Sequence, residues 1–261
     1  DVKMAWKSDW YITLDLAAAG TACANMVSVR GGGRALPTSA ECALIFTKRE
    51  NAFYDGREDL RPDLLEINMG ALRTWVNNDA VGRRVDIMFV HLAGKDAGVA
   101  TRDYPAVRLI NGSRLPNSWS AVEPGGLSMA TSAPLYVQGD YNTLNWKPAA
   151  FFADAITFQS NAWVDANQQV PAMRPAAALT TVLAAIAAGH SATTCDWARA
   201  GCATPIYGGG LENFPRFLEN WGSGRTFRYV GSLVSLFTSQ QSLGNWGNNI
   251  NPGFGNGAYY S

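Results

Sequence analysis

The chain has 261 residues, of which 47% are hydrophobic and 16% are charged, and its 21 Lys and Arg balance its 21 Asp and Glu. This length suffices for one large β domain or two small ones with a sizeable core. Zero net charge argues against a nucleic-acid-binding surface that is basic throughout. The sequence has no run of about 18 apolar residues, so we expect no membrane-spanning helix.

The N-terminal part of the chain contains both strand and helix patterns. Residues 10–16 alternate apolar and polar side chains, which predicts a strand, and residues 43–46 form a second strand candidate. The clearest helix begins at residues 61–63, where a Pro suits the first turn, and helical spacing continues to Asn77. Residues 65–69 fit equally well a short strand that leads into a helix at Met69. We expect this helix to cap one end of the fold.

From residue 85 the pattern changes to short strands separated by Asn, Gly and Pro turns. Between about residues 168 and 210 the pattern lapses, and an Ala-rich segment at 175–188 is a helix candidate within what we interpret as an irregular insertion. The strands are predicted at residues 85–90, 107–110, 127–130, 135–137, 155–158 and 226–237.

A short phrase of β-forming residues around a small turn residue recurs in this part of the chain. It reads Leu109-Ile110-Asn111-Gly112-Ser113 and returns at residues 135–142, 155–161 and 229–234. The first three copies start roughly two dozen residues apart, which suits one coil of a parallel β-solenoid. The predicted fold is therefore mainly β: a parallel β-solenoid (β-helix) with an N-terminal capping helix and an irregular insertion. A β-sandwich is the alternative.

The expected domain organisation has three parts. Residues 1–84 form an N-terminal strand and helix cap region, and residues 85–243 form the solenoid with its insertion at about 168–210. Residues 244–261 form a tail rich in Gly, Asn and aromatic residues.

Four cysteines, Cys23, Cys42, Cys195 and Cys202, have spacings that fit neither a zinc ribbon nor a CxxC redox site. Local pairing, Cys23 with Cys42 and Cys195 with Cys202, is the simplest arrangement because each pair brackets a loop rich in small residues. Such disulfides would indicate an oxidising compartment. Four buried free thiols are the alternative.

The densest acidic cluster, at residues 55–63, is interleaved with Arg57 and Arg61. Calcium prefers several oxygen ligands, but the interleaved arginines predict a paired, solvated surface here, so we expect no metal and no cofactor. A DNA-binding face would need a stripe of basic side chains. The candidates for such a stripe are Arg83, Arg84, Arg102, Arg108 and Arg114.

Candidate catalytic groups are few. Asp140, Asp154 and Asp165 lie in or near predicted turns, and polysaccharide hydrolases use two or three nearby carboxylates. Asp in such turns more often accepts hydrogen bonds from backbone amides, and we expect that role. The two histidines are His91 and His190, and the adjacency of Ser191 to His190 does not supply the geometry of a catalytic triad. We therefore predict no catalytic residue.

Aromatic residues in predicted loops are the best binding candidates. Their rings can stack on sugars or bases or form contacts between subunits, while packing on the core is the alternative. The candidates for ligand or assembly contact are Trp119, Trp146, Trp163, Trp246, Tyr259 and Tyr260, with Trp221 as a further loop aromatic.

Eight phrases in a fixed order carry a family resemblance. They include Asn51-Ala52-Phe53-Tyr54-Asp55-Gly56-Arg57-Glu58, and the others lie at residues 64–67, 106–112, 126–131, 134–142, 153–157, 213–221 and 229–237. This set resembles the C-terminal passenger region of PilX-like and large minor-pilin-like bacterial surface proteins associated with type IV pili. The chain departs from a true pilin because it lacks the long apolar N-terminal helix.

The resemblance implies a β-solenoid passenger with a role in surface display, adhesion or the pilus tip, and DNA as one ligand class. It carries no catalytic residue over. We therefore expect an extracellular or bacterial cell-surface structural and adhesive module, a subunit of a filament or pilus-associated assembly, and not an enzyme. Its expected partners are further copies of itself or other pilus subunits, with a glycan or DNA as ligand.

Two alternatives remain at this point. A carbohydrate-active hydrolase or lyase on a β-helix requires Asp140 and Asp154 to converge within about 10 Å. A DNA-binding pilus-tip receptor requires a contiguous arginine stripe and salt-dependent binding.

Overall fold

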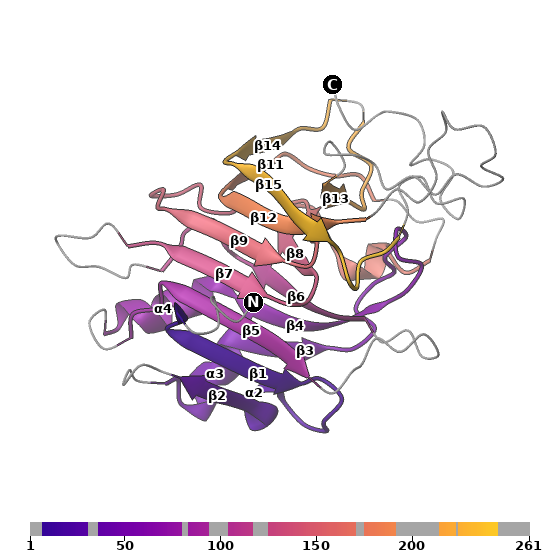
Figure 1. Ribbon diagram of the computed structural model, residues 1–261. Coiled ribbons are helices and arrows are strands. Elements are labelled where there is room, and N and C mark those ends of the chain that lie inside the picture. The colour runs from indigo at the N-terminus through magenta and orange to yellow at the C-terminus, as the bar shows by residue number, and fades with distance from the viewer. Residues whose placement is uncertain are drawn as a thin grey trace.

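The computed structural model describes residues 7–30, 36–79, 83–93, 104–116, 125–170, 175–191, 214–222 and 224–244. These residues form two large β-sheets, one small sheet and three short helices (Figure 1). The helices are α2 (Ala22–Asn25), α3 (Ser39–Ile45) and α4 (Met69–Asn77), and a single 3₁₀ turn, η1, covers Asp165–Asn167.

The larger sheet has seven strands in the order β15-β12-β9-β7-β5-β1-β2. Every neighbouring pair in it is parallel except β1 and β2. Its strands are β1 (Trp10–Asp15), β2 (Met26–Arg30), β5 (Ile87–Ala93), β7 (Leu127–Thr131), β9 (Ala149–Ala153), β12 (Ala185–His190) and β15 (Leu233–Thr238).

The second sheet has six strands in the order β13-β10-β8-β6-β4-β3, of which only β3 and β4 pair in antiparallel fashion. Its strands are β3 (Phe46–Arg49), β4 (Pro62–Asn68), β6 (Tyr104–Ile110), β8 (Leu135–Gln138), β10 (Ile156–Gln159) and β13 (Pro215–Phe217). A parallel pair, β11 (Thr180–Leu183) and β14 (Phe227–Val230), forms the small sheet.

The main hydrophobic core lies between the two large sheets. In β1, Trp10, Ile12 and Leu14 are at most 2% exposed, while the residues between them lie on the other face. Leu65 and Ile67 of β4 join the same core from the six-stranded sheet. The period-two pattern therefore places apolar side chains of each strand toward the opposite sheet. Apolar side chains also lie on the outer face of the six-stranded sheet, where Leu64 and Tyr136 belong to a smaller buried cluster.

The predicted parallel β-solenoid is wrong as a description of this fold, and the β-sandwich alternative is wrong as well. The sheets are flat layers in which parallel pairs are mixed with antiparallel ones, since β2 and β3 run against their neighbours. Between residues 15 and 87, helices and reversed strands replace the short coils that a plain solenoid repeats. A sandwich of antiparallel sheets does not fit, because most strands pair in parallel.

The recurring phrase has a defined place in these layers. Its first three copies coincide with the ends of β6, β8 and β10, which are parallel neighbours in the six-stranded sheet. The fourth copy begins in β14 of the small sheet, so the repeat does not extend through the whole chain.

Two local predictions fail because tertiary contacts override local propensity. Residues 43–46 were expected in a strand, but α3 continues to Ile45 and β3 begins only at Phe46. The Ala-rich helix candidate at 175–188 instead contains β11 and most of β12, and β12 lies between β9 and β15. The small side chains of β12 fit this central position in the sheet. The expected insertion therefore contributes strands to the sheets.

The open alternative at residues 65–69 is resolved in favour of a strand that leads into a helix. β4 ends at Asn68, whose side-chain oxygen accepts a hydrogen bond from the Ala71 amide at 3.2 Å, and α4 begins at Met69. Asn is a favourable N-cap residue because its side chain satisfies an amide of the first turn. The described residues contain no helix that is long and apolar enough to cross a membrane.

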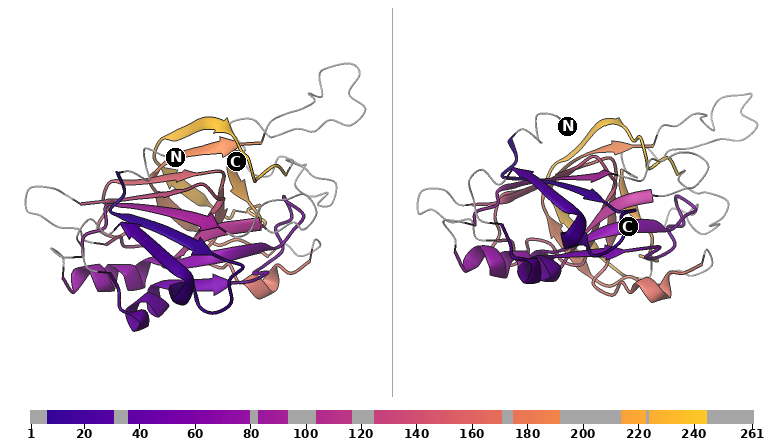
Figure 2. Two further views of the ribbon diagram at one scale, coloured as in Figure 1. Left: turned by 60° about the horizontal axis from the view of Figure 1, so that its bottom comes forward. Right: turned by 90° about the horizontal axis from the view of Figure 1, so that it is seen from below.

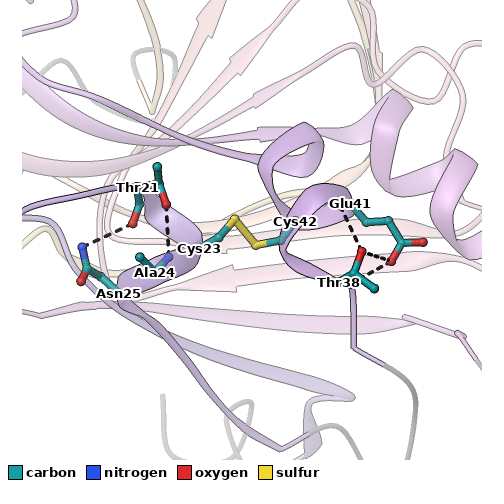
Figure 3. Close-up of a disulfide and its surroundings, with 7 residues drawn as sticks. All are labelled: Thr21, Cys23, Ala24, Asn25, Thr38, Glu41 and Cys42. Carbon is teal, nitrogen blue, oxygen red and sulfur yellow. Dashed lines mark hydrogen bonds between the residues drawn. A yellow bond between two sulfur atoms is a disulfide. The ribbon is translucent and has the colours of Figure 1, made fainter.

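The predicted Cys23–Cys42 disulfide is present and joins α2 to α3 (Figure 3). Thr21 caps α2, and Thr38 with Glu41 forms a reciprocal capping box at the start of α3. All three helices lie near the N-terminal strands, at the end of the layers opposite β14 and β15 (Figures 1 and 2). Cys195 and Cys202 lie outside the described residues, as does most of the predicted tail.

Candidate ligand-binding groove

A groove with a cavity volume of about 460 Å³ opens on the outer face of the six-stranded sheet. Side chains from β3, β4, β6 and β8 form part of its lining, together with the turns that follow β6, β8 and β10. Since parallel strands end at the same edge of a sheet, these turns come together although they lie far apart in the sequence. The volume falls in the range of about 300–1,000 Å³ that is usual for ligand sites.

Arg108 anchors the groove. It lies beside Glu66 on neighbouring strands and donates to Glu66 Oε2 from Nε at 3.0 Å and from Nη2 at 2.6 Å. Its side chain also binds Asp165, at the start of η1, through a bidentate pair of 2.6 and 2.9 Å. Burial by itself lowers the pKa of Arg108. The hydrogen bonds and charges of Asp165 and Glu66 raise it by more, so the pKa of Arg108 lies above its ordinary value. The guanidinium therefore stays charged and fixed.

Trp163 contacts Asp165, the carboxylate partner of Arg108 that lies in the turn after β10. Its indole nitrogen donates to Asp165 Oδ1 at 2.7 Å, and its ring packs edge-on against Phe53 with the ring centroids 5.0 Å apart. The carbonyl of Trp163 accepts a hydrogen bond from Gln138 at 3.3 Å. Because Trp163 is only 4% exposed, it shapes the groove without offering an open ring face.

Several polar groups in the groove have unused hydrogen-bonding capacity. Asp140 uses one carboxylate oxygen to accept from the Thr181 amide at 2.7 Å, and Asn111 and Gln138 each donate from the amide nitrogen. The second oxygen of Asp140, the amide oxygens of Asn111 and Gln138, and the Ser113 hydroxyl have no hydrogen-bond partner among the described residues. Arg49 reaches Glu66 at 3.3 Å, and its side chain is 53% exposed.

Gln159, which is paired with Gln138 in the parallel register of β8 and β10, is fully buried beside the groove. Neither its amide oxygen nor its amide nitrogen has a hydrogen-bond partner. An unsatisfied buried polar group costs about 1–3 kcal/mol, and such groups are expected where a ligand or water completes the bonding.

A second polar cluster, the buried charge network, shares no residue with the lining of the groove. Arg216 of β13 pairs with Glu58 and donates at 2.6 Å to both the Ser191 hydroxyl and the Ser242 carbonyl. Glu58 also accepts from the Gly244 amide at 2.7 Å. These contacts tie the last described residues to the loop before β4.

The same network contains Asp55, Arg57 and two tyrosines. Tyr136 donates to Asp55 at 2.6 Å, and Tyr104 bonds the Ser242 hydroxyl. Burial, together with the nearby charge of Arg216, lowers the pKa of Arg57 to about 9, whereas burial raises the pKa of Glu58. The expected solvated acidic cluster is instead a buried, mutually neutralised network. Its charged groups pair with one another and with backbone groups, so we assign it a structural role.

The three candidate aspartates do not converge. Asp140 and Asp165 line the groove, whereas Asp154 lines a separate hollow on the seven-stranded sheet. The Asp154 carboxylate accepts three backbone amides, from Gln240, Gln241 and Ser242, at 2.5–3.1 Å. This is the turn-forming role expected from the sequence.

The histidines form no catalytic constellation with Ser191. His190 Nδ1 contacts the Ser235 hydroxyl at 2.6 Å, while Ser191 donates to the carbonyl oxygens of Ser242 and Gly244. His91 contacts Ser132 at 3.4 Å. Across the described ranges, no group of three or more His, Cys, Asp or Glu side chains is arranged to hold a metal ion.

The aromatic candidates are placed very differently. Trp146 is 65% exposed, whereas Trp163 and Trp221 are packed into the fold. Trp119, Trp246, Tyr259 and Tyr260 lie outside the described residues.

Three arginines of the predicted stripe are paired with carboxylates. Arg83 contacts Glu41 and stacks over Trp75, Arg84 pairs with Asp86, and Arg108 is buried in the groove. Arg114 lies close to the side chain of Asn145, and Arg102 lies outside the described residues.

Sequence reasoning missed the central ion pair, although a signal for it exists. Glu66 and Arg108 each interrupt an apolar run, as Leu65-Glu66-Ile67 and Val107-Arg108-Leu109. A charged residue flanked by buried apolar neighbours at period two points to the opposite face of a strand.

Comparison of the chain with protein-family models, with curated proteins and with solved structures gave no match, so the interpretation of the groove depends on its own geometry.

Proposed function

We propose that the protein is an extracellular adhesive module whose groove binds a neutral, hydroxyl-rich ligand, namely a glycan. The observation that carries this proposal is that the groove combines an ion cluster whose charges are paired with polar side chains that keep unused hydrogen-bonding atoms. Arg108 is fully committed to Glu66 and Asp165, while Asn111, Ser113, Gln138 and Asp140 keep free hydrogen-bonding atoms.

The chemistry of the free atoms favours a ligand that donates hydrogen bonds. Most of them are acceptors: one carboxylate oxygen of Asp140 and the amide oxygens of Asn111 and Gln138. Sugar hydroxyls both donate and accept, so they can also use the Ser113 hydroxyl and the Arg49 guanidinium.

The charges in the groove argue against nucleic acid as the ligand. Two arginines face three carboxylates, so a phosphate backbone would meet a net negative surface. Catalysis is also not favoured, because Asp154 lies apart from Asp140 and is engaged by three amides.

The disulfide between Cys23 and Cys42 supports an extracellular location, since such bonds persist in oxidising compartments.

The test is a screen of the intact protein on an array of neutral and acidic glycans, followed by titration calorimetry with each hit. We expect binding to neutral glycans, and Arg49→Ala and Ser113→Ala should each weaken it by about tenfold, the loss typical of one hydrogen bond of this kind. Arg228→Ala is the matched control, because Arg228 is an exposed arginine on β14, away from the groove. Absence of binding to any glycan, or binding that both groove variants leave intact, would overturn the proposal.

A further inference from the structure

The end of the layers formed by β14 and β15 has an exposed strand edge, and β15 carries none of the charged side chains that normally discourage the addition of another strand. β15 is the last strand of the seven-stranded sheet and pairs only with β12, and β14 pairs only with β11. The outward backbone groups of β15 therefore have no strand partner among the described residues. Such an edge is a template for another strand.

The side chains at this end are apolar and exposed. Leu233 and Val234 are 47% and 44% exposed, and Val230 of β14 is 65% exposed. Leu236 is unpaired at a bulge between β12 and β15 and is 57% exposed. From residue 227 to 238 the only charged residue is Arg228.

The apolar surface continues from this edge onto the outer face of the seven-stranded sheet. A hollow of about 580 Å³ is lined by Leu236 and Phe237 of β15 together with Phe89, Phe152 and Ala187 of the preceding strands. Thr131, Ser132, Asp154 and Gln240 form the polar part of the lining. Exposed apolar side chains that gather within a polar rim mark interaction sites.

The β3 edge of the six-stranded sheet is protected against the same kind of contact. Edge strand β3 carries Lys48 and Arg49, and charged residues on an edge discourage strand addition. Helices α2 and α3, joined by the Cys23–Cys42 disulfide, pack against β3. The other edge of the seven-stranded sheet is β2, so a head-to-tail contact would join β15 to β2, whereas a two-fold contact joins β15 to itself.

We infer that the β15 edge is the interface for a second copy of this chain, bound by the same edge about a two-fold axis. An open backbone edge requires an extended strand as its occupant, and the near absence of charge makes the edge compatible with itself. In this arrangement the two β15 strands run antiparallel and join the two seven-stranded sheets. Val234 and Leu236 of each copy are covered by the other copy. Because the groove lies on the other sheet, this inference is independent of the proposed ligand.

Mass in solution tests the interface. Light scattering after size exclusion, over a series of concentrations, should show a dimer that dissociates on dilution. Leu236→Lys should give a monomer. Leu44→Lys should remain dimeric, because Leu44 is 68% exposed on α3 at the opposite end. Circular dichroism confirms that both variants fold.

A second measurement needs no variant. Hydrogen exchange of the wild-type protein should show protection of the β15 amides at dimeric concentrations and its loss on dilution. A wild-type protein that is monomeric throughout would overturn the inference. So would open-ended polymers, or a folded Leu236→Lys variant that stays dimeric with β15 exchange independent of concentration.

Discussion

Arg108 holds Asp165 through two parallel hydrogen bonds, Nη1 to Oδ1 at 2.6 Å and Nη2 to Oδ2 at 2.9 Å, and reaches Glu66 with the same side chain. This three-residue ion cluster links β4, β6 and the turn after β10. It therefore sets the shape of the groove.

We expect Arg108→Met to destabilise the protein by about 3 kcal/mol. The substitution keeps the length of the side chain but removes the cation of Asp165 and leaves Glu66, whose side chain is 7% exposed, with only the half-exposed Arg49 at 3.3 Å. Chemical denaturation measures the free energy of unfolding. Arg49→Met is the control and should cost less than about 1 kcal/mol, because Arg49 is half exposed. Equal losses in the two variants would contradict the central role of Arg108.

Asp154 should be a strong local anchor. Asp154→Ala removes the acceptor of three backbone amides and should cost about 2–3 kcal/mol in unfolding free energy. We also expect faster proteolysis within residues 239–244, because the substitution frees this segment. The comparison variant is Asp15→Ala, which removes a single hydrogen bond to the Ala17 amide in an exposed turn and should cost under about 1 kcal/mol. A free-energy loss without faster cleavage would show that the segment is held elsewhere.

The disulfide between α2 and α3 should stabilise the N-terminal end. Replacing Cys23 and Cys42 together by Ser should lower the free energy of unfolding by about 3 kcal/mol, chiefly because the unfolded chain regains its freedom. Thermal denaturation under oxidising conditions measures the loss. A Cys195→Ser and Cys202→Ser double variant separates any contribution of the other cysteines. A Cys23/Cys42 variant with unchanged stability would contradict the prediction.

Glu219 should make stability depend on pH. Burial raises its pKa above 4.5, against the hydrogen bonds that it accepts from Ser160 at 2.5 Å. The folded state therefore binds this proton more tightly than the unfolded state does. The resulting stability is fully present below pH 4.5 and is lost as the pH rises through the folded pKa.

Glu219→Gln cannot ionise and should not suffer this loss. The unfolding free energy of the variant minus that of the wild type should therefore increase from acidic to neutral pH. Denaturant titrations across this range measure the difference, and the other carboxylates cancel because both proteins share them. A difference that is constant with pH would show that Glu219 is ionised equally in both states.

Local sequence patterns predicted much of the strand content. The strands predicted at residues 10–16 and 85–90 correspond to β1 and to the first part of β5, and the Cys23–Cys42 pair is bonded as expected. These features depend on neighbours within one element or one loop. The Ala-rich stretch was predicted wrongly because the contacts that hold β12 in place come from β9 and β15, which are distant in the sequence.

The groove was predictable only in its parts. Asp140, Asp165 and Trp163 were recognised as candidates, but their meeting with Glu66 and Arg108 depends on which strands are neighbours. The sequence by itself determined the alternation of side chains between the two faces of a strand such as β1, because the two-residue period of a strand is a local property, but it did not determine that charged residues such as Arg57 and Arg108 are buried. Only the tertiary structure decided that the sheets are mixed layers, that Arg108 lies beside Glu66, and that β15 ends a sheet. The pairing of strands depends on contacts between residues far apart in the chain, and no local pattern specifies those contacts.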